Sequence, residues 1–396
     1  MSSQLLLTYD FPPIGGGIAR WMGELARRFS AGSLVVSTGA YAGSKAIDHQ
    51  FPNYVDRLPI PSQRLRTAQG LVQWSRRTAA LVSHFPIEFI WCGNLKPASY
   101  PARWAKLRTG VPYGILLHGG DLLIVRDQAQ RSLLKRRAAR ALLDSASVLV
   151  TNSTWTNNLC RSVLNQLGLS LATSRVRTVP LGSDPLVFRP GLDTSEVRRR
   201  YGLDRHRWLL TVARLTAHKG IDTGIQVVAQ LATAYPELVY AVVGCGNHLP
   251  DLQKLAQSLG VLDRVRFFTD VPDADLPALY NCAEIYLGLS RATDQEVEGF
   301  GISLVEASSC GVPIVAGRSG GIPDAVRDGE TGLLVDPEQP ARAAAAVRAL
   351  LDNRPLALRL GAEGRRAVET YFNWNRVAGD LARLGQEYAD RKASGR

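Results

Sequence analysis

The sequence predicts an α/β protein of two doubly wound domains of similar size, whose facing carboxyl strand edges would form a deep cleft. Short apolar segments alternate with segments of helical periodicity along the chain, which is typical of parallel sheets. The alternation occurs twice, separated by a polar stretch containing Pro and Gly at residues 188–195. A chain of 396 residues is long enough for two cores.

In the first half we expect strands near residues 4–8, 33–38, 87–92, 113–117, 147–151 and 176–179. In the second half we expect strands at 208–213, 238–243, 265–268, 285–289, 313–316 and 332–335. A last helical pattern near 375–392 is expected to cross back onto the first domain. The predicted domains are therefore 1–190 and 191–374, followed by a C-terminal segment, 375–396.

The composition is that of a soluble globular protein, with 45% hydrophobic and 21% charged residues. The sequence contains no run of about 18 apolar residues, so no membrane-spanning helix is predicted. The first residues look like a strand and not like a signal peptide. The five cysteines contain no C-x-x-C pair, which argues against a disulfide framework or a zinc site. We therefore expect a cytoplasmic protein with no bound metal.

The positive charge is concentrated in the first half. The net charge is +12, and residues 1–190 hold 23 Lys and Arg against 9 Asp and Glu. Two segments there, 64–82 and 131–143, combine basic and apolar residues at helical spacing. Such helices can lie on an anionic membrane at the inner face of the cell. The alternative is a solvated helix face over the core. No binding motif points to nucleic acid.

The segment Glu298–Glu306 places two carboxylates eight positions apart, in a loop that leaves an apolar strand and enters a helix. Loops of this kind bind ligands in α/β sheets, and a helix start offers unpaired N–H groups to a phosphate. Carboxylates on either side can accept hydrogen bonds from hydroxyls. One short segment could therefore hold a sugar, a phosphate and a ribose.

A Gly-rich loop follows the first predicted strand, between Asp10 and Arg20. Gly15, Gly16 and Gly17 would let the backbone approach a ligand closely. The loop does not match G-x-G-x-x-G, so no dinucleotide site is predicted. The alternative is a tight strand-to-helix turn, in which Asp10 is only a turn residue.

Two cations, Arg214 and Lys219, follow the first strand of the second half. Arg can bind a phosphate bidentately, whereas Lys acts as a point charge. An anion held nearby would explain both, and the alternative is a pair of solvated loop cations.

His118 ends an apolar strand, so it either reaches a ligand or is structural. Asp121 could orient His118, contact an acceptor or cap the next helix.

Gly244 lies at a strand end suited to a diphosphate or base. Asp273-Ala-Asp275 looks like a D-x-D metal motif, but acidic residues opening a helix explain it.

These motifs together resemble the family 4 retaining glycosyltransferases of the GT-B fold, and most of all the bacterial phosphatidylinositol-mannoside mannosyltransferases. The resemblance covers nearly the whole chain. It is carried by Arg214 and Lys219, the E-x7-E spacing of Glu298 and Glu306, the triple-Gly loop, and the segments Phe11–Pro13 and Gly311–Val326.

The resemblance implies a role for each candidate residue. Catalytic roles fall to His118 near the anomeric carbon, Arg214 and Lys219 at the diphosphate, and Glu298 at the sugar hydroxyls. Donor contacts are implied for Gly16, Gly17, Gly244, Val271, Phe300, Gly301, Ile302 and Glu306, the last at the ribose. Acceptor contacts are expected at Asp10, Arg20 and Asp121.

The implied reaction transfers a hexose, of mannose or glucose type, from a nucleoside diphosphate sugar to a lipid-linked or saccharide hydroxyl. The anomeric configuration is retained and no metal or other cofactor is needed. GDP-mannose with a lipid acceptor is favoured, and UDP-sugars with a saccharide or small-molecule acceptor are the alternative. A nucleotide-sugar epimerase, a hydrolase-like enzyme, a phosphorylase and a non-catalytic nucleotide-sugar binder are rival classes. Turnover that depends on an added acceptor would distinguish the transferase from them.

Overall fold

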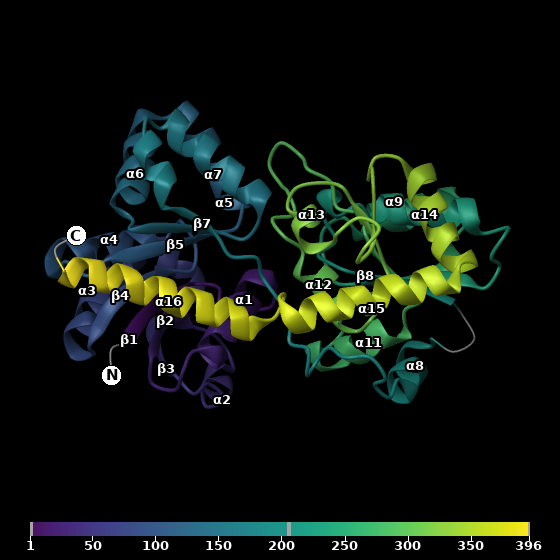
Figure 1. Ribbon diagram of the computed structural model, residues 1–396, viewed down its shortest axis with the longest axis horizontal. Helices are drawn as coiled ribbons and strands as arrows, with labels where there is room; N and C mark the ends of the chain where they lie inside the picture. Colours follow the sequence, from purple (N-terminus) through teal and green to yellow (C-terminus); the bar gives the residue numbers. More distant parts are fainter. Residues whose placement is uncertain (1–2, 204–206, 395–396) are drawn as a thin grey trace. The chain divides into compact units, whose positions relative to one another are not determined.

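The computed structural model of the chain describes residues 3–203 and 207–394. The chain divides into two compact units (Figure 1). The first holds the residues up to Leu181 and those from Trp374 onward, and the second is the continuous segment Gly182–Asn373. Each unit contains one parallel sheet. The predicted fold class is confirmed, and the predicted cleft stays a prediction.

The described part of the first unit forms a seven-stranded sheet in the order β3-β2-β1-β4-β5-β6-β7. The strands are β1 (Ser3–Leu7), β2 (Leu34–Ala40), β3 (Tyr54–Pro61), β4 (Ile87–Cys92), β5 (Tyr113–Leu117), β6 (Val148–Thr151) and β7 (Val176–Thr178). The order reverses between β1 and β4. In parallel sheets this reversal is where loops at the carboxyl edge separate and leave room for a ligand.

Helices cover both faces of this sheet (Figure 1). They are α1 (Gly17–Arg28), α2 (Ser44–Asp48), α3 (Ala68–His84), α4 (Ser99–Thr109), α5 (Gly120–Arg131), α6 (Leu133–Ser145), α7 (Thr154–Gln166) and α16 (Trp374–Ala393), with 3₁₀ turns at Ser62–Arg66 and Ser170–Arg175. Successive strand residues point to opposite faces. Leu5 therefore joins the core cluster with residues of α3 and α4, whereas Gln4 faces α16. Gln4 Nε2 donates to the Ala382 carbonyl at 2.9 Å, which attaches the C-terminal helix to this unit.

The second unit has a six-stranded sheet within its described residues, in the order β10-β9-β8-β11-β12-β13. The strands are β8 (Arg207–Val212), β9 (Leu238–Val243), β10 (Val265–Phe268), β11 (Ile285–Gly288), β12 (Ile314–Gly317) and β13 (Leu333–Val335). The order reverses between β8 and β11. The loops after these two strands therefore meet at a second switch point.

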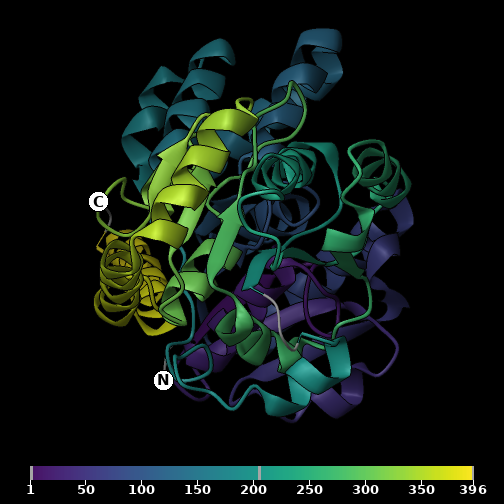
Figure 2. The same cartoon turned by 90° about the vertical axis from the view of Figure 1, so that its right-hand side faces the viewer.

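The helices of the second unit form two groups. The first group packs together and comprises α9 (Ile221–Leu231), α10 (Leu249–Ser258) and α14 (Pro340–Asp352). The second comprises α8 (Ser195–Tyr201), α11 (Leu276–Cys282), α12 (Ile302–Ser309) and α15 (Arg354–Thr370). In Figure 1, α9 and α14 of the first group lie above β8, and α8, α11 and α15 of the second lie below it; Figure 2 turns this view by 90°. Short helices lie at α13 (Ile322–Ala325), Ala217–Lys219, Leu262–Arg264 and Asp273–Asp275.

Strand β3 was not among the strands predicted from the sequence. Its segment carries charged residues and two prolines, so it does not look like a buried strand. It forms the edge of the sheet and pairs only with β2. An edge strand tolerates Pro and charge because one side of its backbone is free of the ladder.

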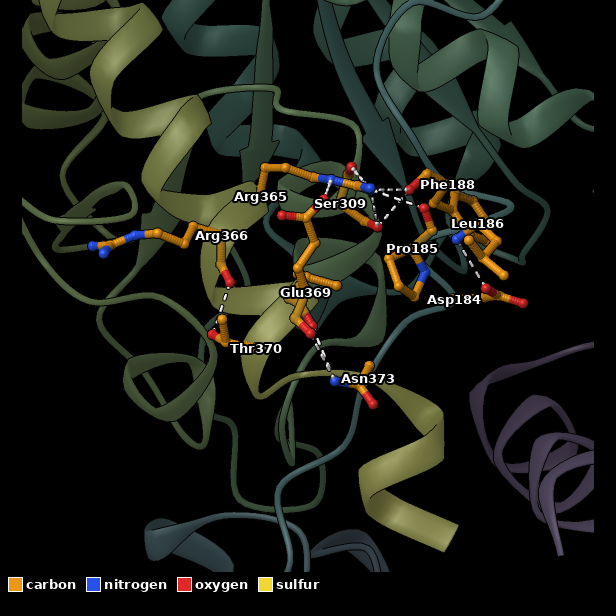
Figure 3. A network of polar contacts seen from close by, with 11 residues as sticks. Asp184, Pro185, Leu186, Phe188, Ser309, Arg365, Arg366, Glu369, Thr370 and Asn373 are labelled. Atoms are coloured by element: carbon orange, nitrogen blue, oxygen red, sulfur yellow. Dashed lines mark hydrogen bonds and ion pairs between the residues drawn. The ribbon is translucent and has the colours of Figure 1, made fainter. Parts of the chain in front are cut away.

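The predicted domain boundary at residue 190 lies too late, because residues 182–190 belong to the second unit. Figure 3 shows the cause: Arg365 Nη1 donates to the carbonyls of Pro185, Phe188 and Ser309 at 3.0, 2.9 and 2.8 Å. The Phe188 ring also packs edge-on against Tyr280, with centroids 5.7 Å apart. The second boundary, after Asn373, lies one residue before the predicted position. The predicted C-terminal segment extends to residues 395–396, which lie outside the described residues.

No helix in the described part of the chain is both long enough and apolar enough to span a bilayer.

Candidate functional site

The predicted site residues fall into two groups, and each group lies at the carboxyl edge of one sheet. In the first unit, Asp10, Gly16 and Gly17 follow β1, whereas His118 and Asp121 follow β5. In the second unit, Arg214 and Lys219 follow β8, and the segment from Glu298 to Glu306 follows β11. The residues after β1, β8 and β11 therefore lie at the switch points of their sheets, whereas His118 and Asp121 follow β5, the strand next to β4.

The Gly-rich loop of the first unit is fixed at its base and exposed at its tip. Arg57 Nη2 donates to the Pro12 carbonyl at 2.6 Å, and Thr8 Oγ1 donates to the Asp10 carbonyl at 3.0 Å. Gly16 has φ 115° and a Cβ there would meet nothing within 4 Å, so only backbone conformation demands the glycine. The exposed residues Gly15–Gly17 thus present bare backbone at the start of α1. Arg20 lies in the first turn of this helix, and its N–H donates to the Gly16 carbonyl at 3.0 Å.

His118 is held by a main-chain contact. Its Nε2 lies 2.7 Å from the Gly93 carbonyl, and the Trp21 ring meets the imidazole edge-on at 5.1 Å. Because a carbonyl can only accept, Nε2 carries a proton, and in the neutral form of the ring Nδ1 has a lone pair. The structure gives Nδ1 no hydrogen-bond partner among the described residues. His118 can therefore accept a hydrogen bond from a ligand hydroxyl.

Asp121 caps the start of α5. Its Oδ1 accepts from the backbone N–H groups of His118, Gly119 and Leu122 at 3.1, 3.1 and 3.0 Å. Of the three roles considered for this residue, capping and orienting the His118 backbone are observed. Its Oδ2 is buried and has no hydrogen-bond partner within the described residues.

Asp10 lies in the electrostatic field of His118. Burial raises the pKa of the Asp10 carboxyl, and His118, Tyr9 and Arg66 act in the opposite direction. Burial, together with the charge of Asp10, raises the pKa of Tyr9 to about 12. The Arg66 guanidinium lies over the Tyr9 ring, 5.5 Å from its centroid. A mixed cluster of hydroxyl, carboxyl and guanidinium groups therefore borders His118.

In the second unit, Lys219 and Glu298 form an ion pair between the loops after β8 and β11. Their side chains are only 15% and 21% exposed. Burial alone would raise the pKa of Glu298, but Lys219, His218 and Arg214 outweigh it and hold this pKa below its usual value. Glu298 is therefore a carboxylate at neutral pH. Arg214 is exposed nearby, and no carboxylate of the described residues pairs with it.

The start of α12 leaves backbone donors open. Gly301 caps the helix with φ 97°, and the N–H groups of Gly301, Ile302 and Ser303 donate to no acceptor in the described residues. Phe300 serves a different purpose through its side chain, which is buried and packs on Phe372 with centroids 5.9 Å apart. Open N–H groups at a helix start beside the Lys219–Glu298 pair can bind a phosphate or polarised hydroxyls.

Glu306 lies in α12 and is 4% exposed. Its Oε2 accepts from the Tyr280 hydroxyl at 2.9 Å, a contact from α11 that the sequence analysis did not predict. The tyrosine hydroxyl therefore fixes one oxygen of a buried carboxylate.

Gly244 has a structural role. Its N–H donates to the Phe268 carbonyl at 2.9 Å, so a ligand does not have this donor available. A Cβ here would lie 2.0 Å from the Ala213 carbonyl oxygen, so glycine lets the loops after β8 and β9 approach. Val271 lies in the loop after β10 and is half-buried.

The D-x-D segment is engaged elsewhere. Asp275 accepts from Arg200 and from the Tyr201 hydroxyl, both at 2.7 Å, and so anchors α8. Within residues 3–203 and 207–394, no group of three or more His, Cys, Asp or Glu side chains is arranged to hold a metal ion.

Sequence reasoning also missed a histidine next to Lys219. His218 is 3% exposed, and its Nδ1 lies 3.0 Å from Glu296 Oε2. Its carbonyl accepts from the Arg291 N–H at 2.8 Å, and Arg291 Nη2 donates to Asp222 at 2.7 Å. These contacts join the loop that carries Lys219 to the loop that carries Glu298. In the sequence, only the position of this histidine next to Lys219, a predicted ligand-binding residue, could have indicated its role.

Gly320 and Gly321 support Glu298 from the loop after β12. The Gly321 N–H donates to the Glu298 carbonyl at 2.8 Å. Gly320 has φ 56°, and a Cβ there would lie 2.4 Å from the same oxygen.

Comparison with known proteins identifies the family. Residues 193–367 match the family described as "Glycosyl transferases group 1", and residues 16–182 match "Glycosyl transferase 4-like domain". The GDP-mannose-dependent alpha-(1-6)-phosphatidylinositol monomannoside mannosyltransferase of Mycobacterium tuberculosis is 31% identical over 398 residues, covering 96% of this chain and 97% of that protein. The chain belongs to the group 1 glycosyltransferases. This glycosyltransferase is also 34% identical over 309 residues to the D-inositol 3-phosphate glycosyltransferase of Acidothermus cellulolyticus, covering 74% of this chain and 66% of that one.

Solved structures share the fold of this glycosyltransferase over its whole length. HepE of Anabaena, in complex with UDP and glucose, aligns with a TM-score of 0.77 at 21% identity, covering 96% of this chain and 98% of HepE. Sucrose-phosphate synthase of Thermosynechococcus elongatus aligns with a TM-score of 0.77 at 21% identity, covering 98% and 99%. At such identities the likeness supports the GT-B fold and nothing narrower.

Proposed function

We propose that this glycosyltransferase transfers mannose from GDP-mannose to a hydroxyl of an inositol-bearing lipid, with retention of the anomeric configuration. The choice of donor and acceptor is supported by the mycobacterial relatives whose names state that donor and acceptor, and which match 96% of the chain. The observation that carries the transfer chemistry is the Lys219–Glu298 ion pair beside the open N–H groups of α12.

The leaving diphosphate requires cations and N–H donors. Lys219 and Arg214 would neutralise its charge as the bond from the anomeric carbon to the phosphate oxygen breaks. The N–H groups of Gly301 and Ile302 would bind an oxygen of the same group. Such preorganised donors are each worth about 3 kcal/mol in comparable sites. No divalent cation is needed in this scheme, because the protein supplies the positive charge.

Glu298 would bind rather than act as an acid or base. Its carboxylate is paired with Lys219, and it would accept hydrogen bonds from sugar hydroxyls. The acceptor hydroxyl forms the new bond to the anomeric carbon, and its proton passes to the departing phosphate oxygen. Glu306, oriented by Tyr280, would hold the ribose hydroxyls.

The first unit would contribute the acceptor side. The free Nδ1 of His118 can accept a hydrogen bond from a sugar hydroxyl, and Asp10 and Asp121 lie at the same sheet edge. The exposed glycines at Gly15–Gly17 would let bare backbone approach the diphosphate. We further propose that the enzyme works at the inner face of the cell membrane as a peripheral protein.

A soluble acceptor is the second candidate. It is favoured by the relatives named D-inositol 3-phosphate glycosyltransferases, including one 34% identical over 74% of the chain. Both candidates share an inositol ring bearing a phosphate, and they differ in the lipid.

The test is a matrix of donors and acceptors. Purified full-length enzyme is incubated with GDP-mannose or UDP-glucose, each with phosphatidylinositol in mixed micelles, inositol 3-phosphate or no acceptor, with and without a chelator. Release of GDP that requires the lipid and survives chelation supports the proposal. Equal release without acceptor would indicate a hydrolase, and a β-linked mannoside by NMR would exclude retention.

A further inference from the structure

The two basic segments of the first unit differ in whether their apolar side chains are buried or exposed. In α3, Trp74 and Leu81 are 0% and 2% exposed, so its apolar side faces the core. In α6, Leu133 and Leu134 are 75% and 76% exposed. Two adjacent leucines with this exposure are not part of the core and need another explanation.

The two leucines stand at the corner between α5 and α6. Helix α5 ends at Arg131, and Ser132 alone links it to α6, where Ser132 Oγ accepts from the Lys135 N–H at 3.4 Å. Leu133 and Leu134 are thus the first two residues of a capped helix. The first buried residue of α6 is Ala139, so the first turn of this helix contributes no residue to the core.

Positive charge surrounds this corner. Residues 124–144 contain six Lys and Arg against two Asp, a balance of +4. Both acidic residues are already near cations: Asp127 pairs with Arg131 at 2.8 Å, and Asp144 lies 3.7 Å from Arg175. Lys135 and Arg137 are exposed, and no carboxylate of the described residues pairs with them.

We propose that Leu133, Leu134, Lys135 and Arg137, together the α5–α6 corner, dock the enzyme on an anionic lipid bilayer. The leucines enter the interface between headgroups and acyl chains, and the two cations meet lipid phosphates. This inference rests on the proposed function, because a lipid acceptor is reached only at a membrane. A nucleic acid would satisfy the cations alone and leave the leucines in water. A bilayer interface satisfies both kinds of side chain.

The test measures vesicle binding separately from catalysis. Full-length enzyme is sedimented with phosphatidylcholine vesicles with and without phosphatidylglycerol. We expect binding only to the anionic vesicles, and weaker binding as salt rises. Leu133→Ser with Leu134→Ser should weaken binding by about tenfold or more, because the loss of two inserted leucines removes apolar burial. Lys135→Glu with Arg137→Glu should abolish the preference for phosphatidylglycerol.

Matched controls lie in the second unit. Leu358→Ser replaces another exposed leucine, which is 61% exposed, and Lys254→Glu with Arg342→Glu replaces two exposed cations. Both controls should bind vesicles as the wild type does. Wild-type enzyme that ignores phosphatidylglycerol, or corner variants that bind as the controls do, would overturn the docking proposal.

Turnover with a water-soluble acceptor distinguishes the two proposals. The corner variants should keep wild-type turnover there, because they lie outside the transfer site. If neither the wild type nor any variant transfers mannose, the proposed function is contradicted. The vesicle-binding result still decides the docking proposal, because it is measured without transfer.

Discussion

Lys219 and Glu298, 79 positions apart in the sequence, form a largely buried ion pair between the loops that follow β8 and β11. The two strands are neighbours at the point where the strand order reverses. The pair fixes a cation and a carboxylate next to the open N–H groups of α12. It thereby joins the motif that would bind phosphate to the motif that would bind sugar.

Lys219→Ala should lower kcat/KM for transfer by about a hundredfold or more, since removal of one preorganised charge costs this much in comparable sites. The variant also leaves Glu298 without its partner. Steady-state release of GDP measures the effect, and circular dichroism checks the fold. Lys254→Ala removes an exposed lysine of the same unit as a control. Near-normal turnover in Lys219→Ala would exclude its role at the diphosphate.

Glu298→Gln and Glu306→Gln should affect different kinetic constants. Loss of the Glu298 charge weakens contacts to the reacting sugar, so kcat should fall by about tenfold to a hundredfold. Loss of the Glu306 charge weakens only ribose binding, so KM for the donor should rise while kcat changes little. Glu330→Gln, at an exposed position, is the control. Identical kinetic profiles for the two variants would refute these separate assignments.

Gly320→Ala should reduce activity by shifting the Glu298 backbone, because its Cβ would lie 2.4 Å from the Glu298 carbonyl oxygen. Gly329→Ala is a matched control, since Gly329 also has positive φ, 74°, but faces open space. Both variants should lose about 1 kcal/mol of stability from the left-handed backbone, and Gly320→Ala should lose more because of this close contact. Only Gly320→Ala should lose turnover as well. Equal turnover in the two would show that the Glu298 backbone tolerates displacement.

The stability of the second unit should depend on pH through His218. Burial lowers the pKa of His218, Lys219 lowers it further, and Glu296 and Glu298 raise it. The unfolded chain takes up this proton near pH 6.5, whereas the folded chain resists it. Stability is therefore full above about pH 6.5 and falls as the pH drops toward the lowered folded pKa.

His218→Gln removes this dependence, so its melting temperature should decrease less between neutral and mildly acidic pH than that of the wild type. His49→Gln replaces an exposed histidine and should keep the wild-type slope. If the wild type and His218→Gln have parallel curves over this range, His218 does not titrate as its burial implies.

The sequence was most predictive where strands are buried on both faces. Strands β4, β5 and β9 begin and end at the predicted residues, because continuous apolar segments are bounded by turns. The partly buried edge strand β10 also has its predicted bounds, because its short segment is mostly apolar. Strand β3 was missed because an edge strand bears charge and proline without penalty. The domain boundary was misplaced because it depends on Arg365 and Ser309, which lie far along the chain from Phe188.

The candidate site was predictable where it follows strand ends. Residues after β1, β5, β8 and β11 can be placed by counting strands, and the structure puts them at the carboxyl edges of the two sheets, those after β1, β8 and β11 at the switch points. Contacts made by partners from other elements could not be predicted in this way. The hydroxyl of Tyr280 on Glu306 and the Gly320–Gly321 support of Glu298 depend on packing between elements. The same holds for Gly244, whose amide is taken by β10.

The second unit begins and ends at adjoining residues. The Ser183 N–H donates to the Phe372 carbonyl at 2.9 Å, and a Cβ on Gly182 would lie 2.6 Å from the backbone of Asn373. A continuous segment with neighbouring ends can be exchanged by two cuts without leaving a loose connection. Chimaeras that take residues 182–373 from a relative can therefore be joined at these two positions, and they would test which unit determines the choice of donor.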